Sequence, residues 1–124
     1  MGRPPEELAG IVERATALDL QLAVHAIGDE AIAETLDALP ADTALRHRIE
    51  RAELLPDDLS AFDAVASMQP NFLRWAREGG LYETRLGDER TAASNRVSDV
   101  LDAAVPLAFG SDCMPLDPLY GVQQ

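Results

Sequence analysis

Four short apolar segments of the sequence are each followed by polar residues that could take part in chemistry. These residues are His25, Arg51, Asn71 and Asp112. If the segments are parallel strands of one sheet, their carboxyl ends meet at the edge where α/β proteins bind ligands. Imidazole and carboxylate are the usual ligands of a hydrolytic zinc ion. His25 and Asp112 together therefore suggest a metal site.

Each residue of this pair also has an ordinary structural interpretation. A single histidine on a strand is more often a packed or hydrogen-bonded side chain than a metal ligand. An aspartate that follows glycine and serine, as Asp112 does, is more often a turn residue or a helix cap. A shared metal site requires His25 and Asp112 to meet in one cavity, whereas two structural roles do not.

The alternation of side chains along a strand predicts which residues face the site. In the first segment, His25 shares a face with the small Ala23, and the bulky apolar residues lie on the other face. We expect the bulky face to contact helices and His25 to lie at the mouth of a cavity on the other face. In the second segment, the alternation predicts a shared face for His47, Ile49 and Arg51.

Hydrophobic spacing predicts the elements that would position these residues. The sequence favours helices at 5–18, 30–39, 57–63 and 92–104. It favours strands at 20–25, 45–50, 64–68 and 105–110, with a long loop containing a helical piece at 71–91. This alternation is typical of a parallel α/β sheet with right-handed crossovers. A small doubly wound domain fits, and so does half of a (β/α)8 barrel, which needs about 250 residues when complete.

The composition argues against two classes of partner. The chain has 124 residues, of which 22 are acidic and 10 are basic, and its formal net charge is -12. Such a protein lacks the cationic face that nucleic acids and anionic membranes require. Cys113 is its one cysteine, and no apolar run approaches the roughly 20 residues of a membrane span. We therefore expect a cytoplasmic protein of one domain.

Four ordered segments carry a resemblance to a known family. They are residues 23–29 (AVHAIGD), 46–50 (RHRIE), 67–72 (SMQPNF) and 105–112 (VPLAFGSD). The chain resembles amidohydrolase family 3, whose members are metal-dependent hydrolases with a TIM-barrel fold. The resemblance implies that the four strands are the fifth to eighth of such a barrel. Residues 1–124 would then form the C-terminal half-barrel of an amidohydrolase-like catalytic domain.

The same resemblance implies a chemistry for the strand ends. His25 would be a metal ligand, and Asp112 would hold the metal and act as general base for a water that attacks a carbonyl. The metal would be divalent, and zinc suits these two ligands. The substrate would be a small molecule with a non-peptide C–N bond of the amide type. Asn71 follows the third strand, and from this position, not from the resemblance, it could orient that substrate.

Two departures from the family pattern bear on activity. Arg51 stands where the family has histidine, and a guanidinium has no lone pair to give a metal. It could pair with Asp112, bind a substrate carboxylate or point to solvent. The family's early His-x-His pair would lie upstream of these residues. Because two ligands are too few for a catalytic zinc, we expect the chain alone to bind metal weakly and to lack hydrolase activity.

The sequence leaves two other functions open. The chain could be a noncatalytic relic or regulatory binding module that kept the fold and lost the metal site. It could also be an independent small α/β binding domain. A half-barrel has two unpaired strand edges, so we expect a homo-oligomer or pairing with the missing N-terminal half. Segment 71–91, with Trp75 and Tyr82, is either part of a lid over the site or an ordinary surface loop.

Overall fold

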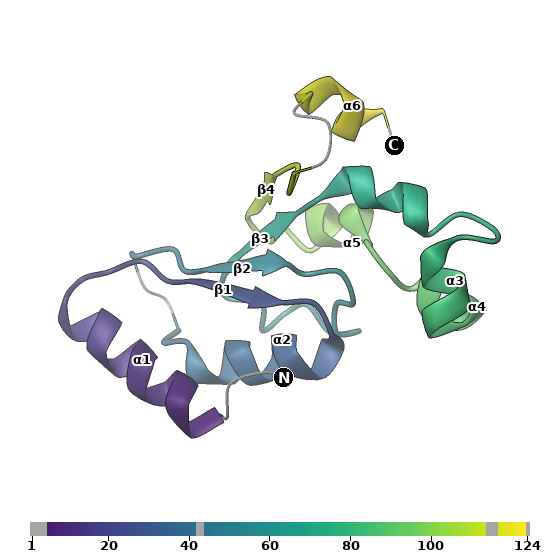
Figure 1. Ribbon diagram of the computed structural model, residues 1–124. Helices are drawn as coiled ribbons and strands as arrows, with labels where there is room; N and C mark the ends of the chain where they lie inside the picture. The colour runs from purple at the N-terminus through teal and green to yellow at the C-terminus, as the bar shows by residue number, and fades with distance from the viewer. Residues whose placement is uncertain (1–4, 42–43, 114–116, 124) are drawn as a thin grey trace.

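The sheet of the protein contains four parallel strands in the order in which they occur along the chain. The computed structural model describes residues 5–41, 44–113 and 117–123. Its strands are β1 (Ala23–Ala26), β2 (Arg48–Arg51), β3 (Val65–Met68) and β4 (Leu107–Phe109) (Figure 1). The order β1-β2-β3-β4 and the parallel pairing confirm the predicted parallel α/β architecture. A doubly wound sheet reverses its strand order, whereas a TIM barrel winds in one direction, so the sheet is that of a partial TIM barrel.

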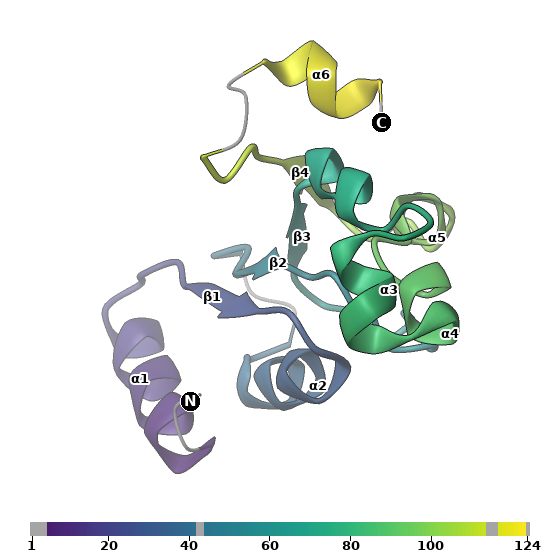
Figure 2. The ribbon, with the colours of Figure 1, turned by 45° about the vertical axis from the view of Figure 1, so that its right-hand side comes forward.

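Helices cover one side of the sheet. The first two, α1 (Pro5–Ala17) and α2 (Asp29–Ala38), lie together beneath β1 in Figure 2. The remaining helical segments are η1 (Pro70–Trp75), α3 (Leu81–Leu86), α4 (Asp88–Ala92), α5 (Val97–Asp102) and α6 (Pro118–Val122). Ala23 and His25 of β1 are exposed on the side away from α2, as the alternation predicts. The polar face of the sheet is therefore open where the interior of a complete barrel would be.

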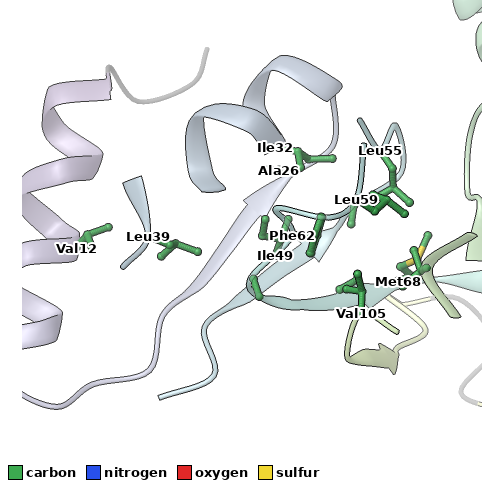
Figure 3. Packing of buried hydrophobic residues seen from close by; sticks show 14 residues of the cluster. Val12, Ala26, Ile32, Leu39, Ile49, Leu55, Leu59, Phe62, Met68 and Val105 are labelled. Carbon is green, nitrogen blue, oxygen red and sulfur yellow. The ribbon is translucent and has the colours of Figure 1, made fainter. Parts of the chain in front are cut away.

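The core between the sheet and its helices is apolar. Ile32 of α2, Ile49 of β2, Met68 of β3 and Val100 of α5 are each 0% exposed, and Figure 3 shows the first three packed together with their neighbours. Burial of an aliphatic side chain of this size stabilises the folded state by about 1.5–3 kcal/mol. This packing holds the strands side by side and so fixes where their carboxyl ends lie.

The helix predicted at 57–63 does not form, and this prediction is wrong. The chain makes only bends and turns there. The carboxylate of Asp58 accepts a hydrogen bond of 2.9 Å from the backbone N–H of Ser60, a local bond that competes with helical hydrogen bonding. Leu59 and Phe62 are nevertheless buried in the core cluster, so the segment serves as an irregular covering of the core.

Left-handed backbone positions shorten two other predicted elements. Arg46 has a φ of 52°, and β2 begins at Arg48 rather than at residue 45. Asn95 has a φ of 51°, and α5 begins at Val97 rather than at residue 92. Positive φ values do not continue a strand or a right-handed helix. The loop predicted at 71–91 contains most of η1, all of α3 and most of α4, and α6 was not predicted.

The described helices are all short. None of them has the length and apolar character that a membrane-spanning helix needs.

Candidate functional site

His25 and Asp112 line one cavity at the carboxyl edge of the sheet. This cavity, which we call the strand-end hollow, measures about 410 Å³. Its lining residues come from all four strands or from the turns that follow them, and they are Ala23, His25, Glu50, Arg51, Ser67, Gln69, Gly110 and Asp112. The convergence of the strand ends on one cavity is the geometry that a shared site requires. It argues against an independent binding domain in which the two residues have separate structural roles.

The register of the parallel strands explains why these residues meet. His25 of β1 lies opposite Glu50 of β2, and Glu50 lies opposite Ser67 of β3. Residues in register on neighbouring strands point to the same face of a sheet. Glu50 also forms an ion pair of 2.8 Å with Arg48, two residues earlier on the same face. A polar row therefore crosses the sheet toward the turn that carries Asp112.

Arg51 enters the strand-end hollow because the backbone leaves the strand conformation at that residue. Its φ is 83°, and the φ of Ala52 is 45°. The prediction that Arg51 shares a face with Ile49 is therefore wrong, since alternation stops at the positive φ. Asp112 and Cys113 make a second such turn after β4, with φ values of 44° and 63°. Each residue of this kind costs of order 1–3 kcal/mol, so the surrounding contacts must hold the two turns in place.

The guanidinium of Arg51 supplies those contacts. Nη1 donates to Oδ2 of Asp112, and Nε donates to Oε1 of Glu53 at 2.7 Å. The guanidinium carbon also lies 4.2 Å from the ring centroid of Phe72. The side chains of Arg51 and Glu53 are 18% and 5% exposed, so the charge-assisted bond between them is largely shielded from water, whereas the side chain of Asp112 is 48% exposed. The structure thus shows the pairing with Asp112, one of the three alternatives that the sequence left open.

Glu53 extends this pairing to helix α3. Its side chain is 5% exposed, and its Oε2 accepts a hydrogen bond of 2.5 Å from the hydroxyl of Tyr82. The result is a continuous chain of polar contacts from Tyr82 through Glu53 and Arg51 to Asp112. Burial, together with the hydrogen bond to Glu53, raises the pKa of Tyr82 well above its ordinary value of 10.0.

The residues present do not by themselves fit a catalytic metal. Oδ2 of Asp112 is bound by a guanidinium, which would also repel a divalent cation. Within the described ranges, no group of three or more His, Cys, Asp or Glu residues could hold a metal ion. His47 cannot supply the missing ligand, since it is 1% exposed and its Nδ1 accepts the backbone N–H of Leu22 at 3.0 Å. His25 and Asp112 could serve a metal only with further ligands from outside the residues that the structure describes.

Asn71 lies next to the strand-end hollow but does not line it. It is 2% exposed, and its Nδ2 donates to the backbone oxygen of Ser111 at 2.9 Å. This bond ties η1 to the turn that carries Asp112. A role in orienting substrate stays a prediction for Asn71.

Gln69, which follows the third strand, is a lining residue to which the sequence analysis gave no role. It is 5% exposed, and its Oε1 has no hydrogen-bond partner in the part of the chain that the structure describes. The sequence signal that could have found Gln69 is its spacing of two residues from Ser67, because side chains two positions apart on a strand point to the same face, here toward the strand-end hollow. A buried acceptor without a partner is costly to leave unsatisfied, which makes Gln69 a candidate for contact with a substrate N–H.

The comparisons with known proteins agree with this architecture. Residues 1–124 match the amidohydrolase family known as Amidohydro_3. The chain is 28% identical over 127 residues to the putative amidohydrolase YtcJ of Bacillus subtilis, covering 95% of this chain and 24% of that protein. It is 32% identical over 132 residues to the protein LONG AFTER FAR-RED 3 of Arabidopsis thaliana, covering 96% of this chain and 22% of that protein.

Two solved structures are also similar, and both are uncharacterised metal-dependent hydrolases. The structure from Pyrococcus furiosus matches with a TM-score of 0.79 at 30% sequence identity, and the match covers 99% of this chain and 26% of the Pyrococcus furiosus chain. The structure from Pyrococcus horikoshii OT3 matches with a TM-score of 0.80 at 31% sequence identity, and the match covers 98% of this chain and 25% of the Pyrococcus horikoshii chain. The chain thus belongs to the amidohydrolase family. It spans about a quarter of the length of the relatives it matches.

Replacing Arg51 by histidine should increase the affinity of the chain for zinc. The substitution releases Oδ2 of Asp112 and adds an imidazole to the strand-end hollow, so we expect binding about tenfold tighter or more. Isothermal titration with zinc chloride measures the change. The matched control is Arg51→Gln, which removes the guanidinium without adding a ligand. Equal affinities for Arg51→His and Arg51→Gln would show that position 51 does not reach a metal at this edge.

The raised pKa of Tyr82 predicts a loss of stability at high pH. A group whose folded-state pKa is raised contributes stability that is intact below its ordinary pKa of 10.0 and is lost as the pH rises above it. Urea unfolding between pH 8 and pH 11 should therefore show a free energy of unfolding that falls above about pH 10. Tyr82→Phe should flatten this fall. An equally steep fall in Tyr82→Phe would contradict the prediction.

Proposed function

We propose that residues 1–124 are the C-terminal half of the catalytic barrel of a metal-dependent hydrolase that cleaves amide-type C–N bonds in small molecules. The observation that carries the proposal is the presence of His25 and Asp112 in one hollow at the carboxyl edge of the sheet. Membership of the amidohydrolase family supports the class of reaction. The divalent metal, zinc by the type of ligand, belongs to the assembled barrel, because this chain alone does not fit it.

Asp112 is the group in this chain best placed to move a proton. Its side chain is 48% exposed in the hollow, and Arg51 binds only Oδ2. Oδ1 can then accept a proton from an attacking water and pass it to the leaving nitrogen. Arg51 fixes the orientation of the carboxylate during both transfers. Gln69 and His25 line the same hollow and would contact the substrate or the water.

A noncatalytic binding module is the second candidate. The ion pair between Arg51 and Asp112 favours it, since it engages the carboxylate that the reaction needs. A protein that lost hydrolysis could keep the hollow and bind a small molecule there. The two candidates differ in whether a complete barrel containing this chain turns over a substrate.

A chimeric hydrolase tests the proposal. Residues 1–124 replace the matching quarter of the Pyrococcus horikoshii OT3 hydrolase, and the purified protein is assayed for bound zinc and for hydrolysis of small amides. We expect hydrolysis that Asp112→Asn lowers by about 10²–10⁴-fold. Asp117→Asn is the matched control, because Asp117 caps α6 through the N–H of Leu119 and asparagine caps equally well. The isolated chain, dialysed after exposure to zinc, should retain well below one equivalent.

Two outcomes would contradict the proposal. Near-stoichiometric zinc in the isolated chain would show that residues 1–124 complete a metal site alone. A zinc-loaded chimera without amide hydrolysis would favour the noncatalytic module.

The edges of the sheet predict association. β1 and β4 each pair with one neighbour in the described sheet, and an unpaired strand edge is a template for a further strand. We propose that the chain pairs with the N-terminal half of the barrel or, without it, with a second copy. Size-exclusion chromatography with light scattering on the purified chain should give a dimer or larger species. A monodisperse monomer of 13.4 kDa would contradict this expectation.

A further inference from the structure

A second cavity lies beside the strand-end hollow and shares Arg51 with it. This cavity, which we call the apolar pocket, measures about 280 Å³, near the lower limit for small-molecule sites. Its apolar wall is formed by Ile27, Leu54, Trp75, Leu81 and Leu86. Because Arg51 lines both cavities, a molecule held in the apolar pocket would extend toward Asp112.

The segment 71–91 builds most of this wall. Trp75 closes η1 and stacks on Phe72, with ring centroids 4.4 Å apart. Leu81 opens α3 and is 51% exposed, and Ile27, in the loop after β1, is 37% exposed. Partly exposed apolar side chains that face one cavity favour an apolar occupant, since burial stabilises by about 25 cal/mol per Å². Segment 71–91 thus forms a wall of the apolar pocket, which lies beside the strand-end hollow.

The charge of the pocket points to the kind of occupant. Glu53 is engaged by Arg51 and Tyr82, and Arg51 is engaged by two carboxylates. The side chain of Arg85 on α3 lines the pocket and makes no hydrogen bond or ion pair within the described part of the chain. A guanidinium free at the rim of an apolar pocket is complementary to a carboxylate. This local cation contrasts with the net charge of -12, which would otherwise repel an anion.

We infer that the apolar pocket binds the apolar or aromatic end of a small carboxylic acid, with Arg85 pairing with the carboxylate. This inference rests on the proposed function, because it names the substrate class of the same site. The acid would carry its scissile amide toward Asp112 past Arg51. Arg85 is then a residue that determines specificity.

Binding of simple probes to the purified chain tests the inference without any activity. Trp75 is the one tryptophan in the sequence, so its fluorescence reports on the pocket directly. We expect phenylacetate to give a saturable change and to bind about tenfold tighter than phenylacetamide, the difference expected of a charge-assisted hydrogen bond. Acetate, which lacks the ring, should give no saturable change.

Two variants separate the apolar and the charged contributions. Arg85→Gln should abolish the preference for phenylacetate over phenylacetamide and leave phenylacetamide binding intact. Leu81→Glu should weaken both probes, and glutamate suits the first turn of a helix. The matched controls are Arg14→Gln on α1 and Leu101→Glu on α5, where Leu101 is 60% exposed. Both controls should bind as the unaltered chain does.

The outcomes distinguish this inference from the proposed function. Absence of saturable phenylacetate binding would overturn the inference. Retention of the preference in Arg85→Gln would also overturn it. An inactive chimera that still binds phenylacetate through Arg85 would contradict the proposed function alone. An active chimera whose KM for an amide substrate that carries both an aromatic ring and a free carboxylate is unchanged by Arg85→Gln would contradict the inference alone.

Discussion

The parallel register of β1 to β4 is the constraint on which the site depends. Because each strand pairs with its neighbour in the sequence and runs in the same direction, every strand delivers its last residues to one edge. His25 is thereby aligned with Glu50 and Ser67, and the turn after β4 brings Asp112 to the same hollow. The apolar core beneath, with Ile49 completely buried, holds this alignment. The chemistry is therefore assembled from distant parts of the chain by packing that takes no part in it.

Arg51 gives this edge its particular character. Its guanidinium cannot be deprotonated in a protein, so it places a permanent positive charge between the carboxylates of Asp112 and Glu53. The charge satisfies both carboxylates, yet it engages an oxygen that a metal would need. The same side chain lines both the strand-end hollow and the apolar pocket. A family of metal-dependent hydrolases thus contains a chain that assembles the edge of the site around an ion pair.

The sequence predicted what depends on local spacing. The four strands, the helices α1 and α2 and the exposed face of β1 follow from hydrophobic periodicity, which is a property of neighbouring residues. Prediction from the sequence failed where the backbone departs from the φ values of regular strands, and for this reason Arg51 was assigned to the wrong face of β2. It also missed contacts between distant segments, such as the bond from Tyr82 to Glu53 and the pocket built by the 71–91 segment. No local pattern encodes which distant side chains meet.

The most direct test of this geometry uses residues that the chain already contains. Cys113 is exposed, is the one cysteine and follows Asp112, so a nitroxide attached to it marks the turn after β4. The broadening of nearby proton resonances falls steeply with distance. His25 lies opposite Glu50, whereas His47 precedes Glu50 by about 10 Å along the strand direction and so lies farther from the strand ends. The account therefore predicts that the imidazole resonance of His25 is broadened more than that of His47. Recovery of the line on reduction of the nitroxide confirms the cause. An unaffected His25, or stronger broadening of His47, would contradict a shared cavity for His25 and Asp112.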